Sequence, residues 1–295
     1  MRARLSIVAI AAVGWLLSAV PTAEAVFPGS NGRIAFTRPD RILTMEPDGS
    51  DAVVVRRNAS EPAWNAAGTR IAFSGARRTG KTDIFVMAAD GSDVRGVTRF
   101  RPGFNLAPAW SPDGRTIVFV HNAREGTDLY SVGRRGRNLT RLTTSPRIVE
   151  RAPEWSPDGS RILFSRARET GAPTDEDLYT IAPDGSDLTR LTRSRLHDFQ
   201  GSWAPDGDRI VFVRETPRLG PKAFVMGADG SDATRLTNDA LNEFWPSFAP
   251  DGTRIVVSRC EEFACDLYLI DPDGSNATLL TGSPALDSRP DWQPV

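Results

Sequence analysis

Short apolar runs separated by turn residues follow one another along the chain, in an order that repeats. In one unit the runs lie at residues 152–155, 161–165, 177–181 and 188–191. The run at 177–181 alternates with a period of two, which is typical of a β-strand. The turns between runs contain Pro-Asp-Gly, in which Pro fixes one turn angle and Gly accepts a positive φ. The pattern therefore predicts four short strands in each unit.

An aromatic residue marks the end of the first strand in each unit. These residues stand 44 to 48 positions apart, at Trp64, Trp110, Trp155, Trp203, Phe248 and Trp292. A fixed period of this size indicates a repeat architecture, and four short strands per unit are the signature of a β-propeller blade. We expect these aromatic side chains to fill the core between blades rather than to form sugar-stacking platforms, because radial repetition requires one bulky residue per blade.

The two ends of the chain each supply part of one further unit. Residues 288–294 read as a first strand with half of its turn, and residues 31–36 read as the other half and a second strand. Pairing the C-terminal strand into the first blade closes the ring and leaves only short, protected sheet edges. The sequence thus predicts an all-β, six-bladed β-propeller of four-stranded antiparallel blades.

The repeated unit resembles that of a known family. Its order is Trp-Ser-Pro-Asp-Gly at 155–159, Leu-Tyr at 178–179, Asp-Gly-Ser at 184–186 and Leu-Thr at 191–192. This order resembles the WD-repeat-like propeller repeat of the TolB family, over nearly all of residues 27–295. The resemblance implies the propeller fold and a tendency towards protein binding. The same repeats occur in the propeller domains of dipeptidyl peptidase and prolyl oligopeptidase relatives. TolB proteins carry a further α/β domain before the propeller, and we expect none between Ala25 and Asn31.

The first residues predict export. A basic start at Arg2 and Arg4 precedes an apolar run at 5–20 and the small-x-small sequence Ala23-Glu24-Ala25. This is the pattern of a secretory signal peptide at 1–25, followed by a propeller at 26–295 in a secreted or periplasmic protein. The alternative is an uncut membrane anchor, for which the run is short, since a full span needs about 20 residues. Export also favours a disulfide between Cys260 and Cys265, across one predicted hairpin.

Charge and composition exclude some classes of function. The formal net charge is −1, and it becomes −2 when Arg2, Arg4 and Glu24 leave with the signal peptide. A nucleic-acid binder would show a basic patch or stripe, so we expect no nucleic-acid partner. We also expect a monomer that does not span the membrane after the signal peptide is cleaved. The acidic residues of the Pro-Asp-Gly turns are expected to bond their own turn backbone.

One column of the repeat is acidic. The position five residues before the aromatic holds Ala59 in one unit and a polar side chain in the other five: Asn105, Glu150, Asp198, Glu243 and Asp287. We place this position where one blade crosses to the next, at a mouth of the central channel. We favour a solvated acidic rim partly neutralised by Arg151 and Arg289. The alternative is a site for a cationic ligand or for Ca²⁺ or Mg²⁺, which prefer oxygen ligands.

The loops between the second and third strands open on the same face and are rich in arginine. We expect them at residues 74–82, 121–127, 166–176 and 214–222. Loop insertions on one face of a repeat ring often mark the binding side. The predicted binding face combines these arginines with aromatic residues near the centre: Arg77, Arg78, Arg124, Arg166, Arg168, Arg214, Arg218, Phe104, Phe199, Phe244 and Trp245.

Catalytic motifs are weak in this sequence. There is no Gly-x-Ser-x-Gly elbow, and the two histidines, His121 and His197, lie in different units. We therefore predict a non-catalytic, exported scaffold that binds a protein or another component of the cell envelope. The alternative is a glycan-binding or lyase/hydrolase-type propeller in which paired carboxylates at the acidic channel mouth do the chemistry.

Overall fold

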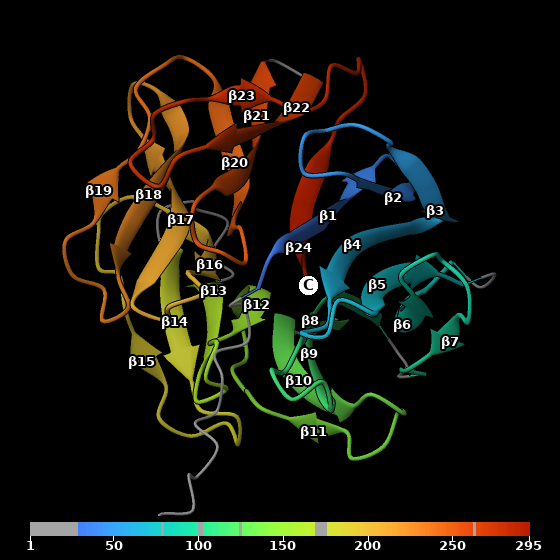
Figure 1. The fold of residues 1–295 in the computed structure, drawn as a ribbon. Coiled ribbons are helices and arrows are strands. Elements are labelled where there is room, and N and C mark those ends of the chain that lie inside the picture. Colours follow the sequence, from blue (N-terminus) through green and yellow to red (C-terminus); the bar gives the residue numbers. More distant parts are fainter. Residues whose placement is uncertain (1–28, 78–79, 100–102, 124–125, 169–175, 262–263) are drawn as a thin grey trace, which may run out of the picture.

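Six four-stranded sheets surround a central axis in the computed structural model of this chain (Figure 1). The structure describes residues 29–77, 80–99, 103–123, 126–168, 176–261 and 264–295. The strands of every sheet are antiparallel and are joined in chain order, apart from one sheet that contains both ends of the chain. The predicted six-bladed propeller is therefore confirmed.

The blades are numbered here in chain order. Blade 1 contains β24 (Ser288–Pro294), β1 (Asn31–Arg38), β2 (Arg41–Met45) and β3 (Val53–Arg57). Blade 2 contains β4 (Ala59–Trp64), β5 (Arg70–Ala76), β6 (Thr82–Ala88) and β7 (Arg95–Gly96). Blade 3 contains β8 (Phe104–Trp110), β9 (Thr116–Ala123), β10 (Gly126–Gly133) and β11 (Thr140–Arg141).

The remaining blades follow the same order, from the innermost strand outward. Blade 4 contains β12 (Ile148–Trp155), β13 (Ile162–Arg168), β14 (Asp177–Ile181) and β15 (Thr189–Arg190). Blade 5 contains β16 (Asp198–Trp203), β17 (Arg209–Thr216), β18 (Gly220–Gly227) and β19 (Thr234–Arg235). Blade 6 contains β20 (Asn242–Phe248), β21 (Ile255–Glu261), β22 (Ala264–Ile270) and β23 (Thr278–Leu279).

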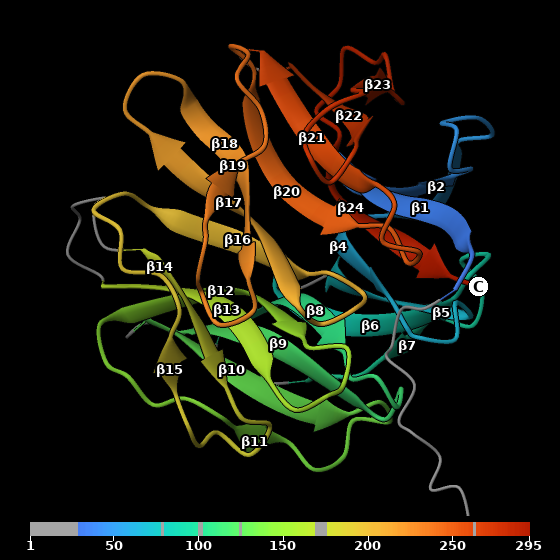
Figure 2. The same ribbon diagram turned by 60° about the vertical axis from the view of Figure 1, so that its left-hand side comes forward.

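The ring is closed by the C-terminal strand. Figures 1 and 2 both show β24, in red, beside β1, in blue, and Ile34 pairs with Trp292 across these strands. The Ser30 N–H donates to the Val295 carbonyl at 2.8 Å. The two ends of the propeller therefore meet in one blade, as the sequence predicts.

The two faces of the ring differ in their connections. Each inner strand begins on the face that carries the connections between second and third strands, here called the loop face. It ends on the opposite face, here called the turn face, which carries the Pro-Asp-Gly and Asp-Gly-Ser turns. In these turns the Asp side chain accepts a backbone N–H, as in the 2.9 Å bond from Ser160 to Asp158.

The core lies between the blades rather than inside each sheet. All six aromatic landmarks are buried, and each packs with residues of two neighbouring blades. Trp110, for example, packs against Ala72 and Val86 of blade 2 and against Ile117 and Phe119 of its own blade. This confirms the prediction that the aromatics fill the inter-blade core.

Two expected boundaries were wrong. The first strand of blade 4 was expected at residues 152–155 but begins at Ile148, so Glu150 lies within an inner strand and not on a crossing between blades. In the acidic column only Asp287 lies outside the inner strands, directly before β24. Residues 121–127 and 214–222 were expected as open loops, but most of each forms a tight hairpin. In both hairpins the strand pairing continues nearly to the tip, which leaves little free loop.

Three further predictions concern the compartment. Cys260 and Cys265 are directly paired across β21 and β22 and form the expected disulfide, with Cα atoms 4.1 Å apart. The predicted signal peptide at 1–25 lies outside the described residues. Within the described part of the chain, the structure contains no helix long and apolar enough to cross a bilayer.

Candidate functional site

A bulge in every inner strand determines which side chains face the central channel. The pairing of inner and second strands shifts by one residue near its middle in all six blades. The extra residue reverses the normal alternation of faces, because side chains in a strand alternate with a period of two. In β12 the buried positions are thus Glu150, Pro153 and Trp155, spaced by three and then by two.

The acidic column is therefore buried and does not form the predicted rim of the channel mouth. Asn105, Glu150, Asp198, Glu243 and Asp287 are each 0% exposed. Asp198 accepts hydrogen bonds from Nε and Nη2 of Arg214 at 2.6 and 2.8 Å. Asp287 accepts two from Arg38, both of 2.7 Å. Because each of these carboxylates is enclosed with an arginine of its own blade, they do not gather around a common centre.

Glu243 and Glu150 also join neighbouring blades. Glu243 pairs with Arg259 at 3.0 Å in its own blade, and it accepts the Thr237 hydroxyl at 2.6 Å and the Ala223 N–H at 2.8 Å from blade 5. Glu150 binds Thr143 and the Leu129 N–H of blade 3, but its nearest Arg166 nitrogen is 3.7 Å away. Burial raises the pKa of Glu150 to about 7.

The residue opposite each of these positions varies with it. Glu150, Asp198 and Glu243 lie directly across from arginines, Asn105 lies across from His121, and Ala59 lies across from Gly75. Buried charges are expected to be paired, so a blade that lacks the acidic residue should also lack the arginine opposite it. We therefore interpret this column as a set of structural clamps. Among the described residues no cluster of three His, Cys, Asp or Glu could hold a metal ion.

A second column, which we call the channel column, lies at the bulges. It holds the residue three positions before each aromatic, always with a positive φ between 49° and 56°: Glu61, Ala107, Ala152, Gln200, Trp245 and Arg289. A left-handed conformation is uncommon for residues other than Gly, and bulges often re-aim side chains next to functional sites. All six residues line the central cavity.

Four neighbouring members of the channel column are linked to one another. Arg289 forms an ion pair with Glu61 and stacks on the Trp245 ring, with 5.4 Å from guanidinium to ring centroid. The backbone N–H of Trp245 donates to the Gln200 Oε1 at 2.8 Å. The other two members are Ala107 and Ala152 of blades 3 and 4, so one side of the channel is held by polar contacts and the other is lined by methyl groups.

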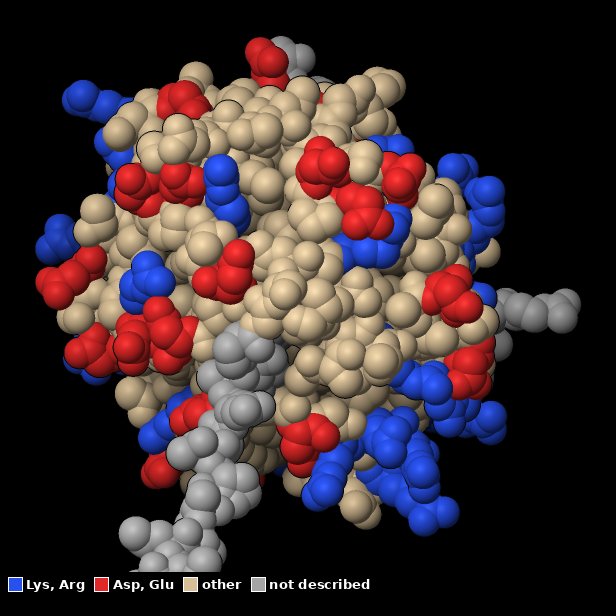
Figure 3. Space-filling model, viewed as in Figure 1, with Lys and Arg blue, Asp and Glu red and all other residues tan. Residues whose placement is uncertain are grey.

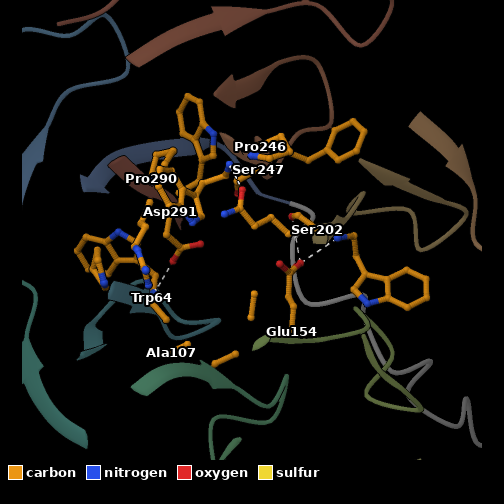
Figure 4. A pocket seen from close by; sticks show the side chains of 18 of the residues that line it. Trp64, Ala107, Glu154, Ser202, Pro246, Ser247, Pro290 and Asp291 are labelled. Carbon is orange, nitrogen blue, oxygen red and sulfur yellow. Dashed lines mark hydrogen bonds between the residues drawn. The ribbon is translucent and has the colours of Figure 1, made fainter. Parts of the chain in front are cut away.

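Two carboxyl groups enter the channel closer to the turn face. Figure 4 shows Glu154 and Asp291 on opposite sides of the cavity. Glu154 accepts a hydrogen bond from the backbone N–H of Trp203 at 2.9 Å and from the Ser202 hydroxyl at 3.1 Å. Asp291 accepts one from the backbone N–H of Trp64 at 2.6 Å. Burial raises the pKa of Glu154 to about 8 and that of Asp291 to about 7. Near neutral pH both groups therefore bind protons readily and can donate hydrogen bonds.

The lining also carries indole donors. The channel has a volume of about 180 Å³. Within the described residues, four of the lining tryptophans are more than nine-tenths buried and have an indole N–H without a protein acceptor: Trp64, Trp155, Trp203 and Trp292. Buried polar groups in native proteins normally have partners, which include ordered water and ligands. These nitrogens are enclosed in the channel wall, so the donors available to a guest are those of the carboxyl groups of Glu154 and Asp291, which suit a guest that offers acceptors, such as a polypeptide backbone.

The residues of the predicted binding face have several different environments. Arg166 and Arg214 are clamp partners, and Arg77 binds Asp83 and the Thr98 carbonyl. Arg168 and Arg218 are exposed, while Arg78 and Arg124 lie outside the described residues. Lys81 lies 4.7 Å from the ring centre of the exposed Phe104.

The aromatic residues near the centre are better placed for binding. Phe244 packs on Trp245 with ring centroids 5.5 Å apart, and both are partly exposed. Phe199 is the residue just before Gln200 of the channel column and is also partly exposed. The loop-face mouth of the channel is therefore apolar over blades 5 and 6.

Sequence reasoning missed most of the channel lining. Glu61, Gln200, Glu154 and Asp291 were not singled out, although they carry its polar groups. A signal was present, because five of the six units have Pro two residues before the aromatic: Pro62, Pro108, Pro153, Pro246 and Pro290. Proline in a strand is confined to edges and bulges, so this spacing indicates an edge strand with an irregularity beside it.

Comparison with known proteins agrees with this architecture. Residues 37–295 match the TolB beta propeller domain family. The protein TolB homolog of Chlorobium luteolum is 36% identical over 166 residues, which is 53% of this chain and 36% of that protein. The Tol-Pal system protein TolB of Desulfosudis oleivorans is 28% identical over 149 residues, covering 48% of this chain and 32% of that protein. The matched part spans about a third of the length of these relatives.

Solved structures show the same fold at lower identity. TolB from Acinetobacter baumannii has a TM-score of 0.77 at 22% identity, covering 90% of this chain and 67% of that chain. A propeller in a nidogen/laminin complex has a TM-score of 0.73 at 11% identity, covering 88% and 98%. An uncharacterized peptidase of Bacillus subtilis, YuxL, matches over 73 residues at 27% identity, 25% of this chain and 11% of that protein. At such identities the propeller has been used for different functions, and function must be argued from the site.

Proposed function

Because this chain belongs to the TolB beta propeller domain family, we propose that it is an exported, non-catalytic scaffold that binds a segment of a partner protein. The segment enters the channel from the loop face. The export step rests on the secretory pattern of residues 1–25. The partner is a protein of the compartment outside the cytoplasmic membrane.

The observation that carries the proposal is the construction of the channel mouth. Phe244 and Trp245 present an apolar surface at the loop face, and Trp245 is kept in a left-handed conformation between Arg289 and Gln200. Below this surface the carboxyl groups of Glu154 and Asp291 can donate hydrogen bonds into the cavity. Aromatic anchors beside placed polar groups are typical of protein-binding hot spots, and an extended peptide supplies both apolar side chains and backbone acceptors.

The catalytic alternative loses its residues. It depended on Glu150, Asp198, Glu243 and Asp287 at an open acidic mouth with a divalent cation, and each of these side chains is buried in a clamp. A buried carboxylate held by its own arginine is not placed to act on a substrate. The scaffold proposal does not need these groups.

A site-specific cross-linking experiment tests the proposal. A photoreactive phenylalanine analogue replaces Phe199 or Phe244 in the full chain expressed in the producing organism, with Val53 on the outer strand of blade 1 as the control position. Val53 is 49% exposed and belongs to an outermost strand. We expect the same partner protein to be cross-linked from both aromatic positions and not from Val53.

The variant Trp245→Ala supplies the matched loss of function. Alanine already occupies the equivalent position in blades 3 and 4, at φ of 50° and 49°, so the backbone can accept it. We expect unchanged folding and a loss of the cross-linked product. If the product persists in this variant, or if Val53 yields it equally, the channel mouth is not the binding site.

A further inference from the structure

One turn of the repeat has its charge reversed. The turn between third and fourth strands reads Asp-Gly-Ser in five blades, but in blade 3 it reads Arg134-Arg135-Gly136-Arg137. The three arginines are exposed, and among the described residues none of them forms an ion pair. Figure 3 shows basic side chains gathered at the lower right, over the connection from β10 to β11.

This reversal removes a bond that the other blades keep. In the five Asp-Gly-Ser turns the Asp Oδ1 accepts the Ser N–H at 2.9 Å. Blade 3 has the same backbone turn, closed by bonds of 2.7 Å between Gly133 and Arg137 and between Gly136 and Gly133, but it has no side-chain acceptor. Local rules that are broken without a gain for folding are expected at functional sites.

The turn borders a small apolar cavity between blades 2 and 3, to which it contributes Gly136. The cavity has a volume of about 190 Å³ and is lined by Val97, Thr98, Arg99, Val132, Gly136 and Leu139. Val97 and Val132 form a buried floor, whereas Leu139 is 44% exposed at the edge. Arg115 adjoins the same turn, because its carbonyl accepts the Arg134 N–H at 2.8 Å. We call these residues the blade 3 patch: Val97, Arg99, Arg115, Val132, Arg134, Arg135, Arg137 and Leu139.

We propose that the blade 3 patch is a second binding surface, which takes an acidic segment of a partner protein with one apolar side chain seated in the cavity. Guanidinium groups pair bidentately with carboxylates. Interface hot spots are well-packed anchor side chains seated in pockets from which water is excluded. The patch lies on the turn face, opposite the loop-face mouth, so this surface is additional to the proposed channel site.

The surroundings of the patch favour a narrow protein segment over other anions. The neighbouring turns carry Asp90 and Asp93 in blade 2 and Asp184 and Asp187 in blade 4. A flat anionic bilayer laid on this face would meet these carboxylates and be repelled by them. A phosphate polymer has no apolar side chain for the cavity. An acidic peptide with one hydrophobic residue satisfies both features.

The test restores the turn of the other blades. The variant Arg135→Asp/Arg137→Ser gives blade 3 the common Asp-Gly-Ser sequence, and we expect an equal or higher Tm because the turn regains its side-chain bond. The control Arg41→Asp/Arg57→Ser makes the same charge change at two exposed arginines of blade 1. The probe is a fluorescent peptide, Asp-Asp-Glu-Leu-Asp-Asp, measured by anisotropy.

We expect the peptide to bind the wild type and the blade 1 control, and to bind the turn-restored variant at least about tenfold more weakly. Binding should weaken at about 0.3 M NaCl and when the peptide Leu is replaced by Ser. Trp245→Ala should leave it unchanged, which separates this surface from the channel site. Equal binding to all variants, or binding only to phosphatidylglycerol vesicles or polyphosphate and not to the peptide, would overturn the proposal.

Discussion

The acidic column, with the residues paired to it, shows one structural requirement met by three kinds of residue pair. In blade 5 the buried Asp198 is held by Arg214, in blade 3 the buried Asn105 Oδ1 lies 2.8 Å from His121 Nδ1, and in blade 2 the pair is Ala59 and Gly75. An ion pair, an amide–imidazole hydrogen bond and an apolar contact each leave no unpaired carboxylate in this column. The pairs, and not the individual residues, are therefore the units that the fold requires.

The first prediction exchanges one solution for another. Arg214→Ala leaves the fully buried Asp198 without its partner and should lower the free energy of unfolding by about 3 kcal/mol. The double variant Asp198→Asn/Arg214→His copies the pair of blade 3 and should recover at least half of that loss. Urea unfolding of Asp198→Asn, Arg214→His and the double variant, treated as a double-mutant cycle, measures the coupling.

An additive result would contradict this interpretation, since it would mean that the two side chains act independently. The same substitutions at an exposed ion pair, Asp206→Asn and Arg209→His, provide the control. The side chains of Asp206 and Arg209 lie 3.0 Å apart. Exposed ion pairs contribute little, so the control cycle should show a coupling close to zero.

A second residue-scale prediction concerns the channel acid Glu154. Burial raises its pKa from the ordinary 4.5 to about 8, so between these values the folded protein holds a proton that the unfolded chain releases. Stability from this group is therefore complete below pH 4.5 and is lost as the pH rises towards 8. Glu154→Gln keeps an oxygen for the Trp203 N–H and removes the titration.

We expect the Tm of Glu154→Gln to fall less than that of the wild type between about pH 5 and about pH 8. Glu215→Gln, at an exposed position of β17, should leave the wild-type slope unchanged. Parallel curves for Glu154→Gln and wild type would show that this carboxyl is not protonated in the folded channel.

At the scale of the elements, the bulge in the inner strand explains why the site was only partly predictable. The repeat indicated every strand, and an unbroken alternation of faces would have pointed Glu150 into the channel. The bulge after Arg151 reverses this, so Glu150 is buried and Glu154 faces the cavity. Glycine never occupies the left-handed position of these bulges, which holds Ala, Glu, Gln, Trp or Arg. A period-two pattern carries no record of such a register shift.

The turns between third and fourth strands show how neighbouring blades fit together. A methyl group added at Gly230 would lie 2.4 Å from the carbonyl oxygen of Leu191 in the preceding blade. Gly207, in the other turn of the same blade, has a similar positive φ and nothing within 4 Å. The two glycines differ mainly in how closely the preceding blade approaches them.

This difference gives the third prediction. Gly207→Ala should cost about 1 kcal/mol, the penalty of a left-handed residue other than glycine. Gly230→Ala carries the same penalty and also separates two blades, so it should cost about 3 kcal/mol. Thermal unfolding compares the two variants. Equal losses would show that the carbonyl contact is easily relieved and that the turns do not fix blade spacing.

At the scale of the whole molecule, the sequence was sufficient for the blade number and for closure of the ring. Five complete aromatic units and one unit divided between the ends determined both, because strands at an open end would leave exposed edges. The function was less accessible, since the channel side chains depend on the bulges and the blade 3 patch depends on how blades 2 and 3 meet around Val97. Such contacts between units are not visible in the repeat itself.

The fourth prediction asks whether closure depends on a blade shared by both ends. Ser30 and Val295 exchange backbone hydrogen bonds of 2.8 and 3.2 Å, so a short glycine linker can join them in a circular permutant. Opening the chain between Asp206 and Gly207 makes blade 5 from both new ends, with β16 pairing to β17 as β24 now pairs to β1. Opening it between Arg195 and Leu196 instead leaves every blade continuous, and the ring is then closed by packing and isolated hydrogen bonds between blades 4 and 5, with no strand pairing across the gap. The two permutants have the same linker and the same composition.

We expect the first to keep a Tm close to that of the unpermuted protein and the second to unfold at least about 5 °C lower, because its ring can open without breaking any sheet. Equal Tm values would mean that the contacts between blades hold the propeller closed by themselves, and that a blade shared by both chain ends adds no stability to the ring.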